Sequence, residues 1–150
     1  MATKYVMDKD LGMRKIMAEF RNAKKAELVV GVLEGSKDAE GFNIAEYAAA
    51  NEYGTDKIPQ RPAIGTAFDE NKQKYIRAMT KIVQGMGGDP FARMVTQLGL
   101  LAEKDIQKTI TGRDFLPKLS EQTIKKKKGS TKTLVDTGSY VNSIKHLIRK

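Results

Sequence analysis

The sequence predicts an α+β fold, in which several helices, among them a long helical hairpin, pack on a small antiparallel sheet. A β-branched run at residues 27–34 and an alternating run near the C-terminus predict two strands, and two long apolar stripes at helical spacing lie between them. With 150 residues, 40% hydrophobic and 30% charged, the chain has the size and composition of one globular domain, residues 1–150.

The N-terminal part is expected to contain a helix, a strand and a loop. An amphipathic helix is predicted over 8–25, with an apolar face formed by Met13, Ile16, Met17 and Phe20. In the strand 27–34, Gly31 indicates a bulge or a close backbone contact. Residues 35–41 are polar and glycine-bearing, and we expect an exposed, mobile loop there.

A second helix is predicted over IAEYAAANEY, residues 44–53. Asn43 and Glu46 have the spacing of a capping pair at its start, and Gly54 provides the left-handed residue that ends it. The connector that follows, 55–67, contains Pro59 and Pro62, which favour extended geometry in the residues before them.

Two long helices are predicted to form an antiparallel hairpin. The first, 66–84, starts at a capping-box-like Thr66–Asp69 pair, and its stripe consists of Phe68, Lys72, Tyr75, Ile76, Met79, Ile82 and Val83. The glycine-rich run QGMGG ends it, and Asp89-Pro90 starts the second helix, 89–110. We expect this second helix to be the central packing element, with Phe91, Val95, Leu98 and Leu101 mostly buried.

The C-terminal quarter is predicted to combine short elements with a strand. Ser120 caps a short helix SEQTIKKK, residues 129–131 form an exposed loop, and Asp136 or Thr137 caps a last turn. The run SIKHLIR, 143–149, is a strand that pairs with 28–34.

Positive charge is concentrated in a basic C-terminal segment, residues 113–150. The whole chain has a net charge of +9, of which this segment holds +7 and residues 1–112 only +2. Its densest part is an exposed lysine loop, 125–133, with Lys125, Lys126, Lys127, Lys128 and Lys132. Such a segment is either a solvated tail or an arm that meets nucleic acid or an acidic protein surface.

The composition excludes several kinds of chemistry. Cysteine is absent, which excludes disulfides and thiolate metal sites, and the single histidine, His146, excludes multi-histidine sites within one subunit. We interpret His146 as a partly packed side chain. The carboxylates Glu46, Glu52, Asp69 and Glu70 are interpreted as helix caps and solvated charges. The start of the chain has no secretory h-region, and no apolar run is long enough for a membrane span, so we expect assembly in the cytosol without a membrane.

Two runs resemble a known family. IAEYAAANEYGTDKIPQRPAIGTAFDENK is similar to a pattern A-x-x-N-E-[FY]-G-T followed by IP-x-RP, and LPKLSEQTIKKKKGSTKTLVDTGSYVNSIKHLI to a pattern P-L-S-x-x-T-I-x-x-K followed by L-x-D-T-G-x-x-x-x-S-I. Together, and in this order, they resemble bacteriophage neck and tail-completion proteins, also called head–tail joining or minor tail proteins, which are related to Mu-type virion morphogenesis proteins. Where Ala63-Ile64 follows Arg61-Pro62, a bulky aromatic residue is common in the family.

The resemblance implies a structural virion protein, not an enzyme, that needs no cofactor and is assembled in the host cytoplasm. It would form a homo-oligomeric ring, hexameric or dodecameric, that joins or completes the tail together with other head–tail connector or tail-tube proteins. The hypothesised interaction residues are Ile58, Pro59, Arg61, Pro62, Lys125, Lys126, Lys127, Lys128 and Lys132.

Two alternatives stay open. A small basic nucleic-acid-binding protein would use the lysines for non-specific contact with DNA. A carboxylate-dependent nuclease or other hydrolase would need an acidic cluster that the sequence does not display.

Overall fold

A computed structural model describes residues 14, 17, 18, 21, 27–84, 91–127 and 130–149. The described elements are β1 (Glu27–Val32), α2 (Ile44–Tyr53), α3 (Ala63–Gln84), α4 (Phe91–Gly112), α5 (Glu121–Lys126), α6 (Ser139–Ser143) and β2 (Ile144–Arg149). The predicted α+β class is confirmed. The predicted helix 8–25, the glycine-rich turn and Asp89-Pro90 lie largely outside the described residues, and the four described residues of 8–25 are helical.

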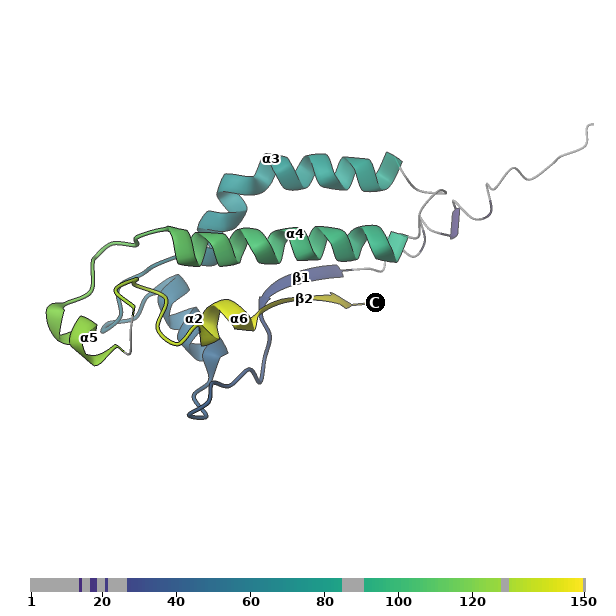
Figure 1. Ribbon diagram of the computed structural model, residues 1–150. Coiled ribbons are helices and arrows are strands. Elements are labelled where there is room, and N and C mark those ends of the chain that lie inside the picture. Colours follow the sequence, from purple (N-terminus) through teal and green to yellow (C-terminus); the bar gives the residue numbers. More distant parts are fainter. Residues whose placement is uncertain are drawn as a thin grey trace, which may run out of the picture.

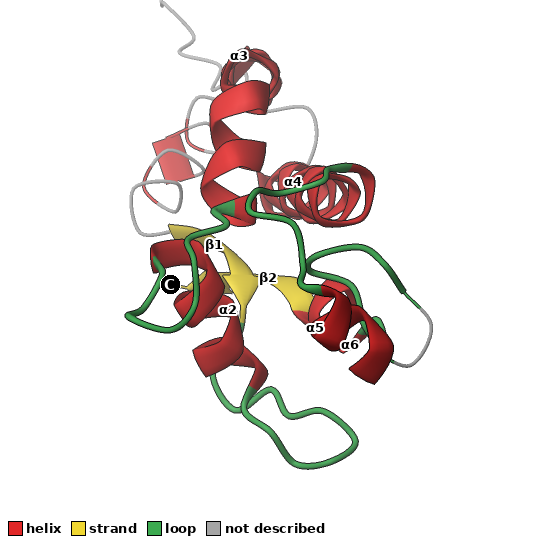
Figure 2. Ribbon diagram, turned by 90° about the vertical axis from the view of Figure 1, so that its left-hand side faces the viewer, coloured by secondary structure: helices red, strands yellow, loops and turns green. Residues whose placement is uncertain are grey.

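The elements form three layers at one side of the molecule and a cluster of short elements at one end. α3 lies along α4 in the opposite direction, and the β1–β2 sheet lies on the other side of α4 (Figure 1). α2, α5 and α6 gather beyond the end of the sheet, beside the C-terminal end of α4 (Figures 1 and 2). The long hairpin predicted from the sequence is therefore present.

α4 is the central packing element, as predicted, but its buried face differs from the predicted one. The buried residues are Val95, Gly99, Ala102, Ile106 and Ile110. Both sides of α4 are covered, so this helix needs small and β-branched residues where the sheet and α3 approach it. The other predicted core residues of the stripe, Phe91, Leu98 and Leu101, are only half-buried.

The two strands pair antiparallel in one continuous register, from Glu27 opposite Arg149 to Val32 opposite Ile144. The predicted pairing is confirmed, although β1 ends two residues earlier than expected. The prediction of a bulge or close contact at Gly31 is wrong: Gly31 pairs in register with Lys145, and a Cβ placed on it would meet no atom of the described residues within 4 Å.

Helix α2 has the predicted bounds and caps. The Asn43 side chain accepts a hydrogen bond from the Ala45 N–H at 3.1 Å and donates one to Glu46 at 2.9 Å. Gly54 ends the helix with a φ of 75°, which favours glycine.

The start of α3 differs from the prediction. The helix begins at Ala63, three residues before the expected cap at Thr66, because a distant carboxylate satisfies its first amides. Oε2 of Glu52 accepts from Ile64 N–H at 3.0 Å, and Oε1 accepts from Gly65 N–H at 2.7 Å. Ala63 is fully buried, so the chain packs tightly at the start of α3.

The apolar stripe of α3 is only partly covered by α4. Tyr75 and Ile82 are buried, whereas Ile76, Met79 and Val83 are between 41% and 52% exposed. The predicted stripe therefore divides into a packed edge and an open edge.

Candidate functional site

The connector between α2 and α3 is held by backbone contacts to the end of α2. The Arg61 N–H donates to the Asn51 carbonyl at 2.6 Å, and the buried Asn51 side chain donates to the Tyr47 carbonyl at 2.9 Å. A Cβ on Gly54 would lie 3.2 Å from the Gln60 nitrogen. The connector thus folds back onto the helix that precedes it.

A tight turn at Thr55 completes this connector. The Thr55 N–H donates to the Ile58 carbonyl at 2.8 Å, and the Thr55 hydroxyl oxygen accepts from the Ile58 N–H at 3.0 Å. Ile58 is half-buried, and Pro59 at the tip is exposed. The motif residues therefore fix the shape of the connector.

Arg61 is buried, with 8% of its surface exposed. Its Nη2 group donates to the Pro117 carbonyl at 2.9 Å, which ties the connector to the segment after α4. The sequence made Arg61 a hypothesised interaction residue. The structure buries most of its surface and bonds it to the carbonyl of Pro117, a residue that is itself exposed.

The prediction of an exposed lysine loop is right for Lys125 and Lys126 and wrong for Lys127. The Lys127 ammonium donates to three carbonyls, those of Lys132 at 2.7 Å, Thr133 at 3.2 Å and Val135 at 3.0 Å. These bonds use all three N–H groups of the ammonium and fold residues 132–135 around it. Lys128 lies outside the described residues.

The rest of this segment is also anchored. Thr133 is buried, and its hydroxyl donates to the Phe115 carbonyl at 3.3 Å. Lys132 makes an exposed ion pair with Asp114 at 3.0 Å. The helix cap at Ser120 is confirmed, since its hydroxyl accepts from the Thr123 N–H at 3.2 Å.

The D-T-G motif forms the turn before α6. The predicted cap at Asp136 or Thr137 is wrong: the N-cap of α6 is Gly138, with a φ of 83° and no side-chain cap hydrogen bond. The Thr137 hydroxyl oxygen accepts from the Ser139 N–H at 3.4 Å within the turn. Tyr140 then packs edge-on against Tyr47, with ring centroids 5.7 Å apart. This contact joins the second motif run to the first.

These segments enclose a groove of about 820 Å³, here called the motif groove. Its walls come from the 38–42 loop, α2, the connector, the end of α5 and the residues around the D-T-G turn. Of the hypothesised interaction residues, Ile58, Arg61, Lys126 and Lys127 line it. Pro59, Pro62, Lys125 and Lys132 do not.

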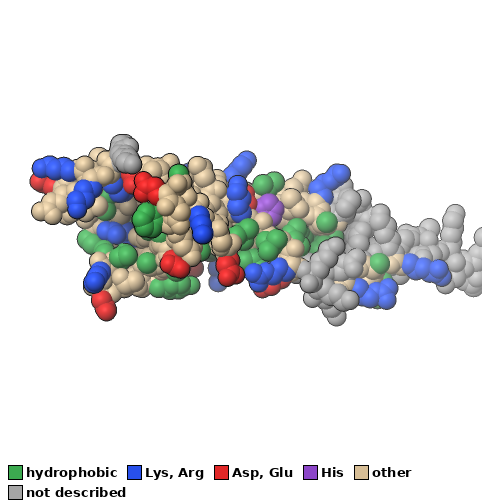
Figure 3. All heavy atoms as spheres, turned by 90° about the horizontal axis from the view of Figure 1, so that it is seen from below, with side chains coloured by type: hydrophobic (Ala, Val, Ile, Leu, Met, Phe, Trp, Pro, Cys, Tyr) green, Lys and Arg blue, Asp and Glu red, His purple; other side chains and the backbone are tan. Residues whose placement is uncertain are grey.

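The motif groove carries charges of both signs. Its lining includes three cations, Arg61, Lys126 and Lys127, and four carboxylates, Asp38, Glu40, Glu46 and Asp136. Figure 3 likewise shows acidic, basic and apolar side chains intermixed on the lower face of the described part. The positive charge that the sequence places in the C-terminal segment is therefore not concentrated in this groove.

Burial shifts the titration of side chains that line the groove. Burial raises the pKa of Tyr47 and Tyr140, and the Arg61 charge opposes the shift at Tyr47. Burial lowers the pKa of Lys127, Asp136 opposes that shift, and the Arg61 charge adds to it. Lys127 is therefore subject to the charges of both Arg61, from the connector, and Asp136, from the turn before α6.

Sequence reasoning missed Tyr47, Tyr140 and the long-range role of Glu52. Glu52 was expected to be a cap, and it is one, but of the next helix. The two tyrosines lie inside the motif runs, so the resemblance pointed at their neighbourhood. The contact between Tyr47 and Tyr140 cannot be predicted from spacing or capping patterns, because the two residues are far apart in the sequence.

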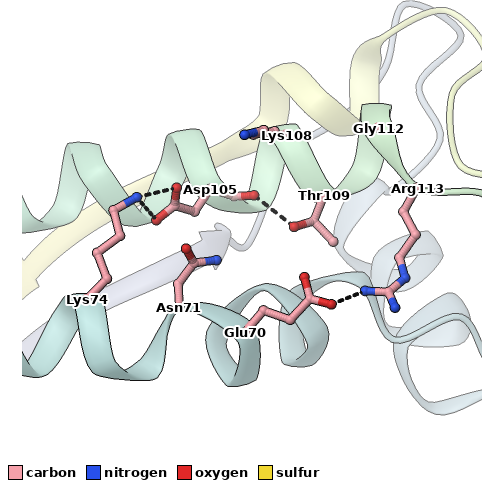
Figure 4. A pocket seen from close by; sticks show the side chains of 8 residues that line it. All are labelled: Glu70, Asn71, Lys74, Asp105, Lys108, Thr109, Gly112 and Arg113. Atoms are coloured by element: carbon pink, nitrogen blue, oxygen red, sulfur yellow. Dashed lines mark hydrogen bonds and ion pairs between the residues drawn. The ribbon is translucent and has the colours of Figure 1, made fainter.

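A second hollow, of about 510 Å³, lies between α3 and α4 (Figure 4). Two ion pairs cross it: Lys74 binds Asp105 at 2.7 Å, and Arg113 binds Glu70. Because these charges already neutralise one another, we interpret this hollow as the place where ion pairs hold α3 and α4 together.

The single histidine is partly packed, as expected. His146 Nδ1 lies 2.8 Å from the Glu103 carboxylate, which also accepts from the His146 N–H at 2.6 Å. The ring lies over Gly99, where a Cβ would come within 2.5 Å of it. This contact fixes β2 on α4.

In the part of the chain that the structure describes, no group of three or more metal-ligating side chains occurs and no helix could cross a membrane. Comparison of the chain with protein families, with curated proteins and with solved structures found no match.

Proposed function

We propose that the protein is a structural subunit of the neck or tail terminus of a phage or prophage virion, where copies form a ring that joins or completes the tail. The observation that carries this proposal is the convergence of the two family-like runs. They are far apart in the sequence, yet both contribute residues to the motif groove, including Arg61 from one and Lys127 from the other.

The roles of the motif residues support a structural protein. Asn51, Glu52 and Gly54 fold the connector back and start the next helix. Thr137 and Gly138 shape the turn that brings Tyr140 onto Tyr47. A family pattern that specifies caps, turns and packing fits a protein whose function lies in its contact surfaces.

The nucleic-acid-binding alternative receives less support from the lysines than their number suggests. Lys127 is engaged with three carbonyls, and Lys132 pairs with Asp114. Binding to duplex DNA should therefore be weak, with a shallow dependence on salt. Tight binding whose affinity falls steeply with salt would favour the alternative instead.

Deletion of the gene in the phage or prophage that carries it tests the proposal. We expect electron micrographs to show filled heads and separate tails, or tails without a proper terminus, and no infectious particles. Complementation with a variant at Gln73, an exposed position on α3, should restore the titre. Replacement of Pro59, which is also exposed, should lower it if the connector makes a ring contact. A normal titre of normal particles without the protein would overturn the proposal.

A further inference from the structure

The open edge of α3 is an apolar stripe that α4 leaves uncovered. Its residues Ile76, Met79 and Val83 are 41%, 45% and 52% exposed, although all three have large hydrophobic side chains. Their spacing of three and four residues puts them on one side of the helix. Lys74, which pairs with Asp105 across the hollow of Figure 4, lies on the opposite side of α3. The open edge therefore faces away from that hollow and is available for another contact.

The N-terminal part of the sequence contains a second stripe with the same spacing. In the predicted helix 8–25, Met13, Ile16 and Phe20 stand at positions i, i+3 and i+7, as the three residues of the open edge do. The four described residues of this segment are helical, and Met17, which adjoins the stripe, is 52% exposed. Each stripe spans roughly 10 Å along its helix axis. The two stripes thus match in pattern and in length, and each has exposed apolar surface to cover.

The course of the chain brings the two stripes to the same end of the molecule. Only residue 26 separates the predicted helix 8–25 from the start of β1 at Glu27. β1 starts at the end of the molecule where α3 finishes (Figure 1). A segment tethered this closely meets the open edge at an effective concentration of about millimolar or more, which favours it over a segment of a second copy at micromolar concentration. A helix docked from this end runs parallel to α3.

The parallel arrangement also suits the one polar member of the α3 stripe. Lys72 lies on the same side of α3 as the open edge, nearer to the start of the helix, and its side chain is exposed. If Phe20 is set beside Val83, Lys72 falls within one turn of Asp10. The polar interruption of one stripe then meets a side chain of opposite charge at the end of the other.

We propose that residues 8–25 dock as a helix on the open edge of α3 of the same chain, parallel to it, with Phe20 beside Val83 and Met13 beside Ile76. The docked segment adds a third helix to the hairpin and covers the apolar side chains that α4 leaves exposed. This inference concerns a contact within one chain and does not rest on the proposed function.

Disulfide mapping in the full chain tests the contact, because the protein has no cysteine of its own. Met17→Cys together with Met79→Cys places two thiols in the proposed contact. In a glutathione redox buffer we expect them to form an intramolecular bond, which peptide mass spectrometry identifies and which leaves a monomer on a non-reducing gel. The control is Met17→Cys with Lys81→Cys, since Lys81 is exposed on the opposite side of α3. That pair should form the bond at least about tenfold more slowly.

Hydrogen exchange measured by mass spectrometry tests the same contact without cysteines. Backbone amides of residues 13–21 should exchange at least about tenfold more slowly in the full chain than in a peptide of that sequence. Met79→Asp places a charge in the middle of the open edge and should remove most of this protection. Gln73→Asp, at an exposed position of α3 outside the stripe, should keep it. Unchanged exchange in α4 shows that each variant is folded.

Three results would overturn the proposal. An intermolecular bond between positions 17 and 79 would make the contact one between copies of the chain. Equal rates for the two cysteine pairs would mean that position 17 has no preferred side of α3, and unprotected amides in 13–21 would mean that the segment does not dock. All of these measurements use the purified protein, so they leave the particle phenotype of the gene deletion untouched.

Discussion

Two regions of this protein are held together in different ways. The hairpin region, formed by α3, α4, β1 and β2, is held by apolar residues at helical and strand spacing. The groove region, formed by α2, the connector, residues 113–138 and α6, shares the apolar core through residues such as Ile44, Phe115 and Leu134. It adds polar contacts between segments distant in the sequence, such as Arg61 with Pro117. The comparison shows that apolar residues at regular spacing build the hairpin region. Specific side-chain contacts shape the groove region, which contains the candidate site and packs on the hairpin region.

The largest effect is expected in the shared core. Ile106 is fully buried on α4, so Ile106→Ala should lower the free energy of unfolding by about 2–5 kcal/mol. Leu100, which is 45% exposed on the same helix, is the control, and Leu100→Ala should cost well under 1 kcal/mol. Urea denaturation measures both. Equal losses would mean that α4 is not the centre of the fold.

In the groove region, one carboxylate replaces a local helix cap. Glu52→Gln keeps the shape but removes the charge from two charge-assisted bonds to α3, and should cost about 1.5–3 kcal/mol. Glu46→Gln, which alters an exposed contact with Asn43, should cost much less. Urea titrations of the two variants decide the matter, and a larger loss at Glu46 would refute the long-range cap.

A close approach joins β2 to α4 in the hairpin region. Gly99→Ala places a Cβ 2.5 Å from the His146 ring, so the strand must shift, with an expected loss of about 1–3 kcal/mol. At Gly112, the end of the same helix, an added Cβ would meet no described atom within 4 Å, so Gly112→Ala should be neutral or slightly stabilising. A thermal melt in which both variants match the wild type would contradict the contact.

The smallest effect concerns the groove region at high pH. Burial raises the pKa of Tyr140 above its ordinary value of 10.0. Because the folded-state pKa is the higher one, the stability from the protonated hydroxyl is complete below pH 10 and is lost as the pH rises above 10, by at most about 1.4 kcal/mol per pH unit. Tyr140→Phe should therefore flatten the loss of stability above pH 10, whereas the exposed Tyr53→Phe should not. An unchanged alkaline slope in Tyr140→Phe would contradict the burial of that hydroxyl.

The same division explains what could be predicted from the sequence. The α+β class, the strand pairing and the bounds and caps of α2 follow from periodicity and capping residues near one another in the chain. The start of α3 was predicted wrongly because Glu52, in another helix, provides its cap. Leu98 was placed in the core because spacing alone does not show which side of α4 each neighbour covers.

The site was predictable only as a set of segments. The motif runs pointed to the connector and to the turn at Asp136, and both line the groove. That Lys127 would fold back onto three carbonyls, and that Arg61 would be buried, depends on contacts that no spacing rule contains. A run of four lysines is typical of a solvated loop, and the fold turned one of them into an internal anchor.

Photo-cross-linking in assembled particles tests the central claim, that the protein is a virion subunit whose groove region makes the contacts. Benzoylphenylalanine replaces Phe42, beside the motif groove, or Gln73, exposed on α3, in protein supplied to the phage that lacks its gene. The account predicts cross-links from position 42 to another virion protein or to a second copy of the chain, and few from position 73. Particles that contain the protein but give no cross-links from position 42, or particles that do not contain it at all, would contradict the account.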